Sequence, residues 1–113
     1  MIIIRSVLCK NKVHRLATEV RKLFNNGKIL IIDTERLSEI FEFITDYTQI
    51  NEISHIEKII EKESDYYQYF AININASEND ISYWKQIEDK YKTNLLLTVQ
   101  DHNIGNAILV EEI

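Results

Sequence analysis

Apolar runs alternate with amphipathic segments along the chain. Five short segments are rich in β-branched, leucine or aromatic residues, which is typical of buried strands. They are MIIIRSVL (1–8), KILIID (28–33), YYQYFAINI (66–74), NLLLTVQ (94–100) and AILVEE (107–112). Between the first four, apolar residues recur every three or four positions, so each of the first three strands is followed by a predicted helix, and the turn-like DHNIGN follows the fourth.

Local signals place the ends of these helices. The first helix is predicted over about 12–25 and ends at Gly27, which accepts a left-handed cap conformation at little cost. The second begins at the N-cap Thr34. Two later pairs have the spacing of a capping box. They are Ser54 with Glu57 and Ser77 with Asp80.

Strands that alternate with helices favour a three-layer α/β fold in one domain, residues 1–113. We expect a mostly parallel sheet of about five strands with helices on both faces. The last strand, 107–112, is a candidate antiparallel edge that could pair with a second copy and form a homodimer. The segment 46–53 is predicted to be an exposed loop.

The net charge of −5 hides an asymmetry. Residues 1–28 carry seven basic side chains against one glutamate, whereas the remaining 85 residues carry six basic and 17 acidic side chains. A basic region of this kind can meet phosphates or an acidic partner, or can pair with the acidic remainder of the same domain. A single cysteine and the lack of a long apolar run lead us to expect a cytoplasmic protein with no membrane partner.

Carboxylates follow two of the predicted strands. Asp33 and Glu35 come at the end of 28–33, and Asp101 follows 94–100. Ligands of open α/β sheets gather at the carboxyl ends of the strands, so these three residues are candidates for metal or acid–base chemistry. The alternative is structural, because acidic residues also stabilise the first turn of a helix.

Two stretches resemble RecA/RadA-like ATPase cores. NNGKILIIDTERLSEIFEFI is similar to a strand of that family that ends in Asp-Thr-Glu before a helix, and ISYWKQIEDKYKTNLLLTVQD to its later helix and strand. The resemblance implies an α/β core related to proteins of DNA recombination and repair. YFAININ stands where the family's magnesium-supporting strand ends in aspartate.

The chain departs from that family at the phosphate-binding loop. Such a loop needs several glycines, a lysine and a Ser/Thr, so that successive backbone N–H groups can wrap phosphates. The segment SVLCKNKVHR after the first strand has no glycine, and the YFAININ strand ends in neutral asparagines. We therefore expect no nucleotide cofactor and a non-catalytic relative that acts as a binding partner or scaffold.

The first predicted helix carries the basic candidates for partner or nucleic-acid binding. Lys12, Arg15, Glu19 and Lys22 follow one helical face, which we expect to lie opposite the apolar stripe, with Lys10 at the helix entry. Such charges could contact phosphates without reading bases.

Other chemistry has little support in the sequence. Cys9 and His14 could form a nucleophilic pair, but no third group is identified to orient them. The three histidines are scattered and no CxxC or HxxxH spacing occurs, so we predict no metal site and no catalytic residues.

Three functional hypotheses follow. The first is a non-catalytic binding or accessory protein, in a DNA recombination or repair complex, that uses the basic helix or a sheet edge. The second is a small viral or mobile-element protein that binds and regulates a host protein. The third, which we favour least, is a small enzyme that uses Asp33, Glu35 and Asp101.

Overall fold

A computed structural model describes residues 1–7, 9–23, 28–34, 47–50, 52–105 and 107–113 of the chain. Strands and helices alternate over residues 2–33 and 47–100, as the sequence predicts, and the last two strands follow each other. In chain order they are β1 (Ile2–Ser6), α1 (Cys9–Leu23), β2 (Ile29–Asp33), β3 (Tyr47–Gln49), the 3₁₀ turn η3 (Ile53–His55), α2 (Ile56–Glu63), β4 (Tyr69–Ala76), the 3₁₀ turn η4 (Glu78–Asp80), α3 (Ile81–Tyr91), β5 (Asn94–Gln100) and β6 (Leu109–Glu112).

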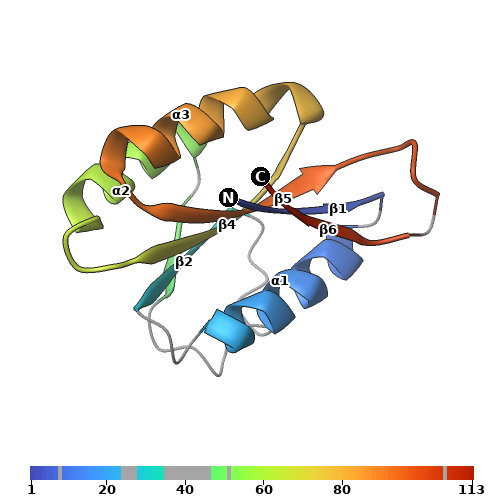
Figure 1. Cartoon of the computed structure of the whole chain (residues 1–113), viewed down its shortest axis with the longest axis horizontal. Helices are drawn as coiled ribbons and strands as arrows, with labels where there is room; N and C mark the ends of the chain where they lie inside the picture. Colours follow the sequence, from blue (N-terminus) through green and yellow to red (C-terminus); the bar gives the residue numbers. More distant parts are fainter. Residues whose placement is uncertain (8, 24–27, 35–46, 51, 106) are drawn as a thin grey trace.

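The strands form one mixed sheet in the order β3-β2-β4-β5-β1-β6. All neighbours are parallel except β6, which runs antiparallel to β1 at one edge. Figure 1 shows α1 on one face of this sheet and α2 and α3 on the other. The predicted three-layer α/β class and the antiparallel last strand are therefore confirmed.

The segment 46–53 does not match its prediction as an exposed loop. Residues 47–49 pair with β2 in parallel register, and Ile50 is buried. The backbone N–H of Ile50 also donates to the carbonyl oxygen of Asp33 at 3.1 Å. Three residues of extended chain beside a fully buried strand are enough to add an edge strand, although their polar side chains favour a loop in the sequence.

Each face of the sheet has its own apolar core. On the α1 side, Val13, Leu16 and Val20 pack against the strand residues Ile4 and Ile31. On the opposite side, α2 and α3 pack against a larger cluster of strand residues that includes Phe70 and Leu97. Because both faces are covered, the central strands are apolar at nearly every position, as parallel strands between helices require.

The predicted helix ends are partly confirmed. The capping box is present: the carboxylate of Asp80 accepts from the backbone N–H of Ser77 at 3.2 Å and from its hydroxyl at 2.8 Å. Ser54 makes no such cap. Its hydroxyl donates to Glu52 at 3.4 Å, because a 3₁₀ turn begins at Ile53.

α1 begins at Cys9, three residues before the predicted position. Its predicted stop at Gly27 and most of the helix predicted after Thr34 lie outside the described residues. No helix in the described part of the chain is both long and apolar enough to cross a membrane.

Candidate functional site

Buried polar side chains meet where the parallel strands end. Asn73 of β4 lies in the middle of this group: its side-chain Nδ2 donates to Oδ1 of Asp33 at 2.8 Å, and its Oδ1 accepts from the hydroxyl of Thr98 at 3.1 Å. All three side chains have no exposed surface. The group links β2, β4 and β5 through hydrogen bonds on the face that α1 covers.

The backbone around this group is paired as well. Thr34 donates to the carbonyl oxygen of Asn73 from both its N–H and its hydroxyl, each at 3.2 Å. Ser6 at the end of β1 and Lys12 of α1 are also buried and have polar partners. Burying a polar group without a partner costs free energy. The bonds among Asp33, Asn73 and Thr98 therefore stabilise the fold.

Asp101, a second strand-end carboxylate, makes no contact with Asp33 in the described part of the chain. Asp101 closes the turn after β5: its Oδ1 accepts from the backbone N–H of Asn103 at 2.9 Å, and its own N–H donates to the carbonyl oxygen of Ser6 at 3.2 Å. Glu35 lies outside the described residues. Asp33 and Asp101 thus both have partners within the fold, which are a strand side chain and a turn N–H.

The basic helix differs from its prediction at Lys12. Its side chain has no exposed surface, so the placement of Lys12 on the outer face is wrong. Arg15 and Lys22 are exposed, but both bind the same carboxylate oxygen, Oε1 of Glu19, at 3.1 Å each. The side chain of Lys10 lies outside the described part of the chain.

The burial of Lys12 and the exposure of Arg15 and Lys22 follow from the angular positions of these residues on α1. The row 12–15–19–22 runs along the border of the sheet-facing surface, and successive members fall on alternate sides of that border. Lys12 and Glu19 lie on the side of the buried Leu16, whereas Arg15 and Lys22 lie on the solvent side. The outer surface of α1 is therefore less basic than its sequence indicates.

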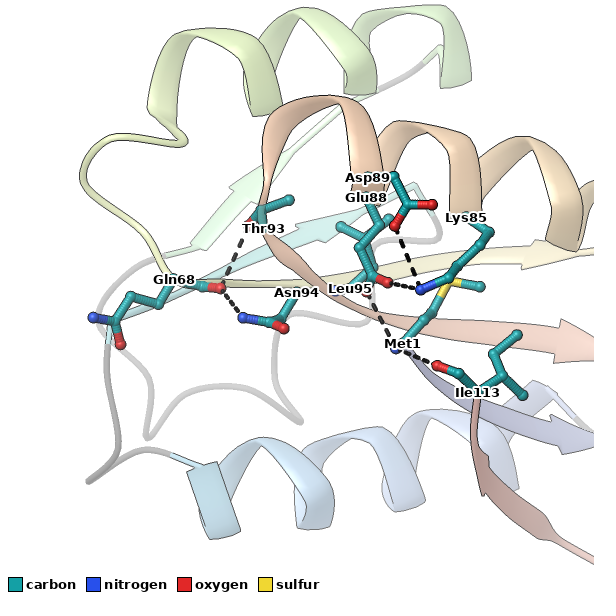
Figure 2. Close-up of polar contacts among 9 residues, drawn as sticks. All are labelled: Met1, Gln68, Lys85, Glu88, Asp89, Thr93, Asn94, Leu95 and Ile113. Carbon is teal, nitrogen blue, oxygen red and sulfur yellow. Dashed lines mark hydrogen bonds and ion pairs between the residues drawn. The ribbon is translucent and has the colours of Figure 1, made fainter.

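The amino ends of the strands hold a second polar cluster, shown in Figure 2. Glu88 of α3 is nearly buried and accepts from Lys85 at 2.7 Å and from the backbone N–H of Leu95 at 2.9 Å. The amino group of Met1 lies 3.3 Å from the same carboxylate. Burial raises the pKa of Glu88, but these three donors outweigh it, and the net pKa is below the ordinary value.

The edge strand β6 presents backbone groups outward. Met1 and Ile113 exchange two backbone hydrogen bonds of 2.9 Å each, so they form a hydrogen-bonded antiparallel pair. Such pairs alternate along a ladder. With Ile2 opposite Glu112 and Ile4 opposite Val110, the N–H and C=O groups of Val110 and Glu112 point away from β1. No described strand lies on that side.

The side chains around this edge divide between the two faces of the sheet. Val110 and Glu112 lie on the α1 face, opposite Ile4 and Ile2. On the other face, Leu109 and Ile113 are 45% and 48% exposed. Exposed apolar side chains next to unpaired backbone groups are typical of a strand that can accept another strand.

An arginine fastens β6 to the rest of the domain. Arg5 of β1 binds Glu78 through Nε at 3.0 Å and through Nη2 at 2.6 Å, and binds Glu111 of β6 through Nη1 at 2.6 Å. The hydrogen bond to Glu78 is the largest influence on the pKa of Arg5, which is raised although partial burial opposes it. Arg5 holds the edge in a fixed position relative to η4.

No group of three or more histidine, cysteine, aspartate or glutamate side chains that could hold a metal ion occurs in the described part of the chain. No protein family model, no curated protein and no solved structure matches this chain.

Sequence reasoning missed two parts of these sites. Thr98 is a polar residue within the apolar run NLLLTVQ, and that interruption is a signal that it bonds to a neighbouring strand. The outward direction of Val110 and Glu112 has no sequence signal, because it depends on which β6 residues form the hydrogen-bonded pairs with β1.

Proposed function

We propose that this protein is a non-catalytic binding protein that holds a partner protein by adding an extended segment of that partner to β6. The observation that carries the proposal is the outward direction of the backbone groups of Val110 and Glu112 at an open sheet edge. In strand addition of this kind, main-chain hydrogen bonds supply affinity and neighbouring side chains supply specificity.

The strand ends favour binding at the edge over an enzyme. Asp33 is buried and bonded to Asn73, and Asp101 accepts from the backbone N–H of Asn103, so both carboxylates already make bonds within the fold. Nucleic-acid binding through α1 also has less support than edge binding. Arg15 and Lys22 share Glu19, and Lys12 is buried.

The resemblance to RecA/RadA-like cores supplies one setting for such a binder, a DNA recombination or repair complex. A small viral or mobile-element regulator of a host protein would use the same binding mode. Both settings require a protein partner at β6, so one experiment on the edge tests the shared part of the proposal.

That experiment uses peptides selected from a random display library against the full chain. Val110→Pro removes the outward N–H without removing a hydrogen bond to β1, whereas Val110→Ala removes side-chain atoms and keeps the N–H. We expect Val110→Pro to abolish peptide binding and Val110→Ala to retain most of it. Far-ultraviolet circular dichroism and thermal melting check that both variants fold. Equal binding by Val110→Pro and the wild type would overturn the proposal.

A further inference from the structure

A cavity of about 230 Å³ opens beside the end of β6, on the face of the sheet that α1 covers. Its wall is formed largely by Ile2, Leu23, Tyr69 and Leu96, and its polar lining includes Asn94 and Glu112. It thus reaches from the open edge across β1 and β5 toward β4, at the amino ends of the parallel strands.

The carboxylate of Glu112 is the charged side chain in the lining of this cavity. Glu112 is exposed at the edge and faces the cavity, because it lies opposite Ile2 in the ladder. Asn94 donates through Nδ2 to the carbonyl oxygen of Gln68 at 3.2 Å, a contact drawn in Figure 2. The amide keeps its Oδ1 as an acceptor and one N–H of Nδ2 as a donor. The cavity therefore combines the carboxylate of Glu112 with apolar side chains and with the neutral polar groups of Asn94 and Tyr69.

We infer that this cavity selects a lysine or arginine of the partner segment; the inference rests on the proposed addition of that segment to β6. A residue directly opposite Glu112 on an added strand has its Cβ about 5 Å from the Cβ of Glu112, where opposite charges attract. Its aliphatic stem lies across the end of β6, and its charged end meets the carboxylate of Glu112 at the mouth of the cavity.

The opposite face of β6 selects apolar residues at the alternate positions of the partner. Leu109 and Ile113 are exposed there, and the charge between them, Glu111, is already bound to Arg5. Successive side chains of a strand point to opposite faces. The partner segment therefore has a basic residue opposite Glu112 on the α1 face and apolar residues on the other face.

Charge also decides between a partner protein and a second copy of this chain. A second β6 would bring its own Glu111 and Glu112 against the same edge, and like charges opposite each other destabilise a strand pair. The chain as a whole carries a charge of −5. A basic segment of another protein is therefore the occupant that the edge favours.

The test uses the tightest peptide from the display selection and two matched variants. Glu112→Gln removes the charge that faces the cavity, and Glu61→Gln removes an exposed charge on α2, away from the edge. We expect Glu112→Gln to raise the Kd roughly five- to tenfold, Glu61→Gln to change it less than twofold, and a norleucine in place of the peptide's basic residue to match Glu112→Gln. Kd is measured by isothermal titration calorimetry.

Two outcomes would overturn the inference while the proposed function stands. They are selected peptides without a basic residue, and equal effects of Glu112→Gln and Glu61→Gln. A wild-type homodimer that Val110→Pro dissociates in sedimentation experiments would show that a second copy occupies the edge, and would overturn both. Peptide binding that Val110→Pro leaves unchanged would instead overturn the proposed function itself. The two failures are therefore distinguishable.

Discussion

Polar groups bond to one another at the carboxyl ends of the strands, whereas at the β6 edge they point outward. At the strand ends, Asp33, Asn73 and Thr98 bond to one another beneath α1 and have no exposed surface. At the edge, the backbone groups of Val110 and Glu112 point to solvent beside exposed apolar side chains. The place that usually holds the ligand of an α/β sheet is here part of the core, and the open hydrogen-bonding groups lie at the edge.

The largest expected effect comes from breaking the buried group. Asp33→Ala leaves Nδ2 of Asn73 without its acceptor, and we expect the free energy of unfolding to fall by about 2–4 kcal/mol. Urea denaturation monitored by circular dichroism measures the loss. A variant as stable as the wild type would show that the strand ends are not a structural centre.

A smaller change sharpens the same point. Thr98→Val replaces the hydroxyl that donates to Asn73 with a methyl group of similar size, and we expect a loss of about 1 kcal/mol. Thr18→Val is the control, because the hydroxyl of Thr18 bonds to the carbonyl oxygen of His14 on the exposed surface of α1. The control should change the stability by less than about 0.5 kcal/mol.

The cluster at the amino ends gives a pH-dependent effect of similar size. The folded-state pKa of Glu88 is below its ordinary value of 4.5. The stability that the ionised Glu88 contributes is therefore fully present above about pH 4.5 and is lost as the pH falls through the folded-state pKa. We expect Glu88→Gln to cost about 1–2 kcal/mol at neutral pH and to flatten this part of the acid dependence. Urea denaturation at several pH values measures both. An unchanged acid dependence would exclude Glu88 as its source.

A still smaller effect is expected where Arg5 fastens the edge. Arg5→Met keeps much of the apolar stem and removes the contacts to Glu78 and Glu111, for an expected loss of about 0.5–1 kcal/mol in thermal melting. Hydrogen exchange of the Leu109 and Glu111 amides, which face β1, should become faster. Slow exchange at those amides in the variant would mean that pairing with β1 alone holds the edge.

The smallest effect is expected at the surface of α1. Because Glu19 binds both Arg15 and Lys22, we expect oligonucleotides to bind weakly even at low salt, and Arg15→Ala to change this little. Fluorescence anisotropy of a labelled oligonucleotide, recorded at several salt concentrations, measures the affinity of both proteins. Tight binding that weakens steeply with salt would restore α1 as a nucleic-acid surface.

The sequence predicts the fold better than the sites. Apolar runs and helical periodicity are local patterns, so the five strands, the helix 81–91 and the Ser77–Asp80 capping box could all be predicted from neighbouring residues. The strand 47–49 was missed because its polar residues pair only with β2, which no local pattern records.

The sites depend on contacts between distant parts of the chain. Asp33 and Asn73 are 40 residues apart, and their bond follows from the parallel register of β2 and β4. Lys12 is buried because it lies one helical turn from the buried Leu16, a position that a stripe drawn through apolar residues alone leaves out. The edge strand itself was predicted, but the direction of its backbone groups required the ladder with β1.

The most direct test of the central claim is amide hydrogen exchange of the full chain with and without a selected peptide. Addition of a strand to β6 predicts slower exchange at Val110 and Glu112 on binding, with little change at Leu109 and Glu111, whose amides already face β1. Protection confined to α1 or to the ends of β2 and β4, with Val110 and Glu112 unchanged, would contradict the account.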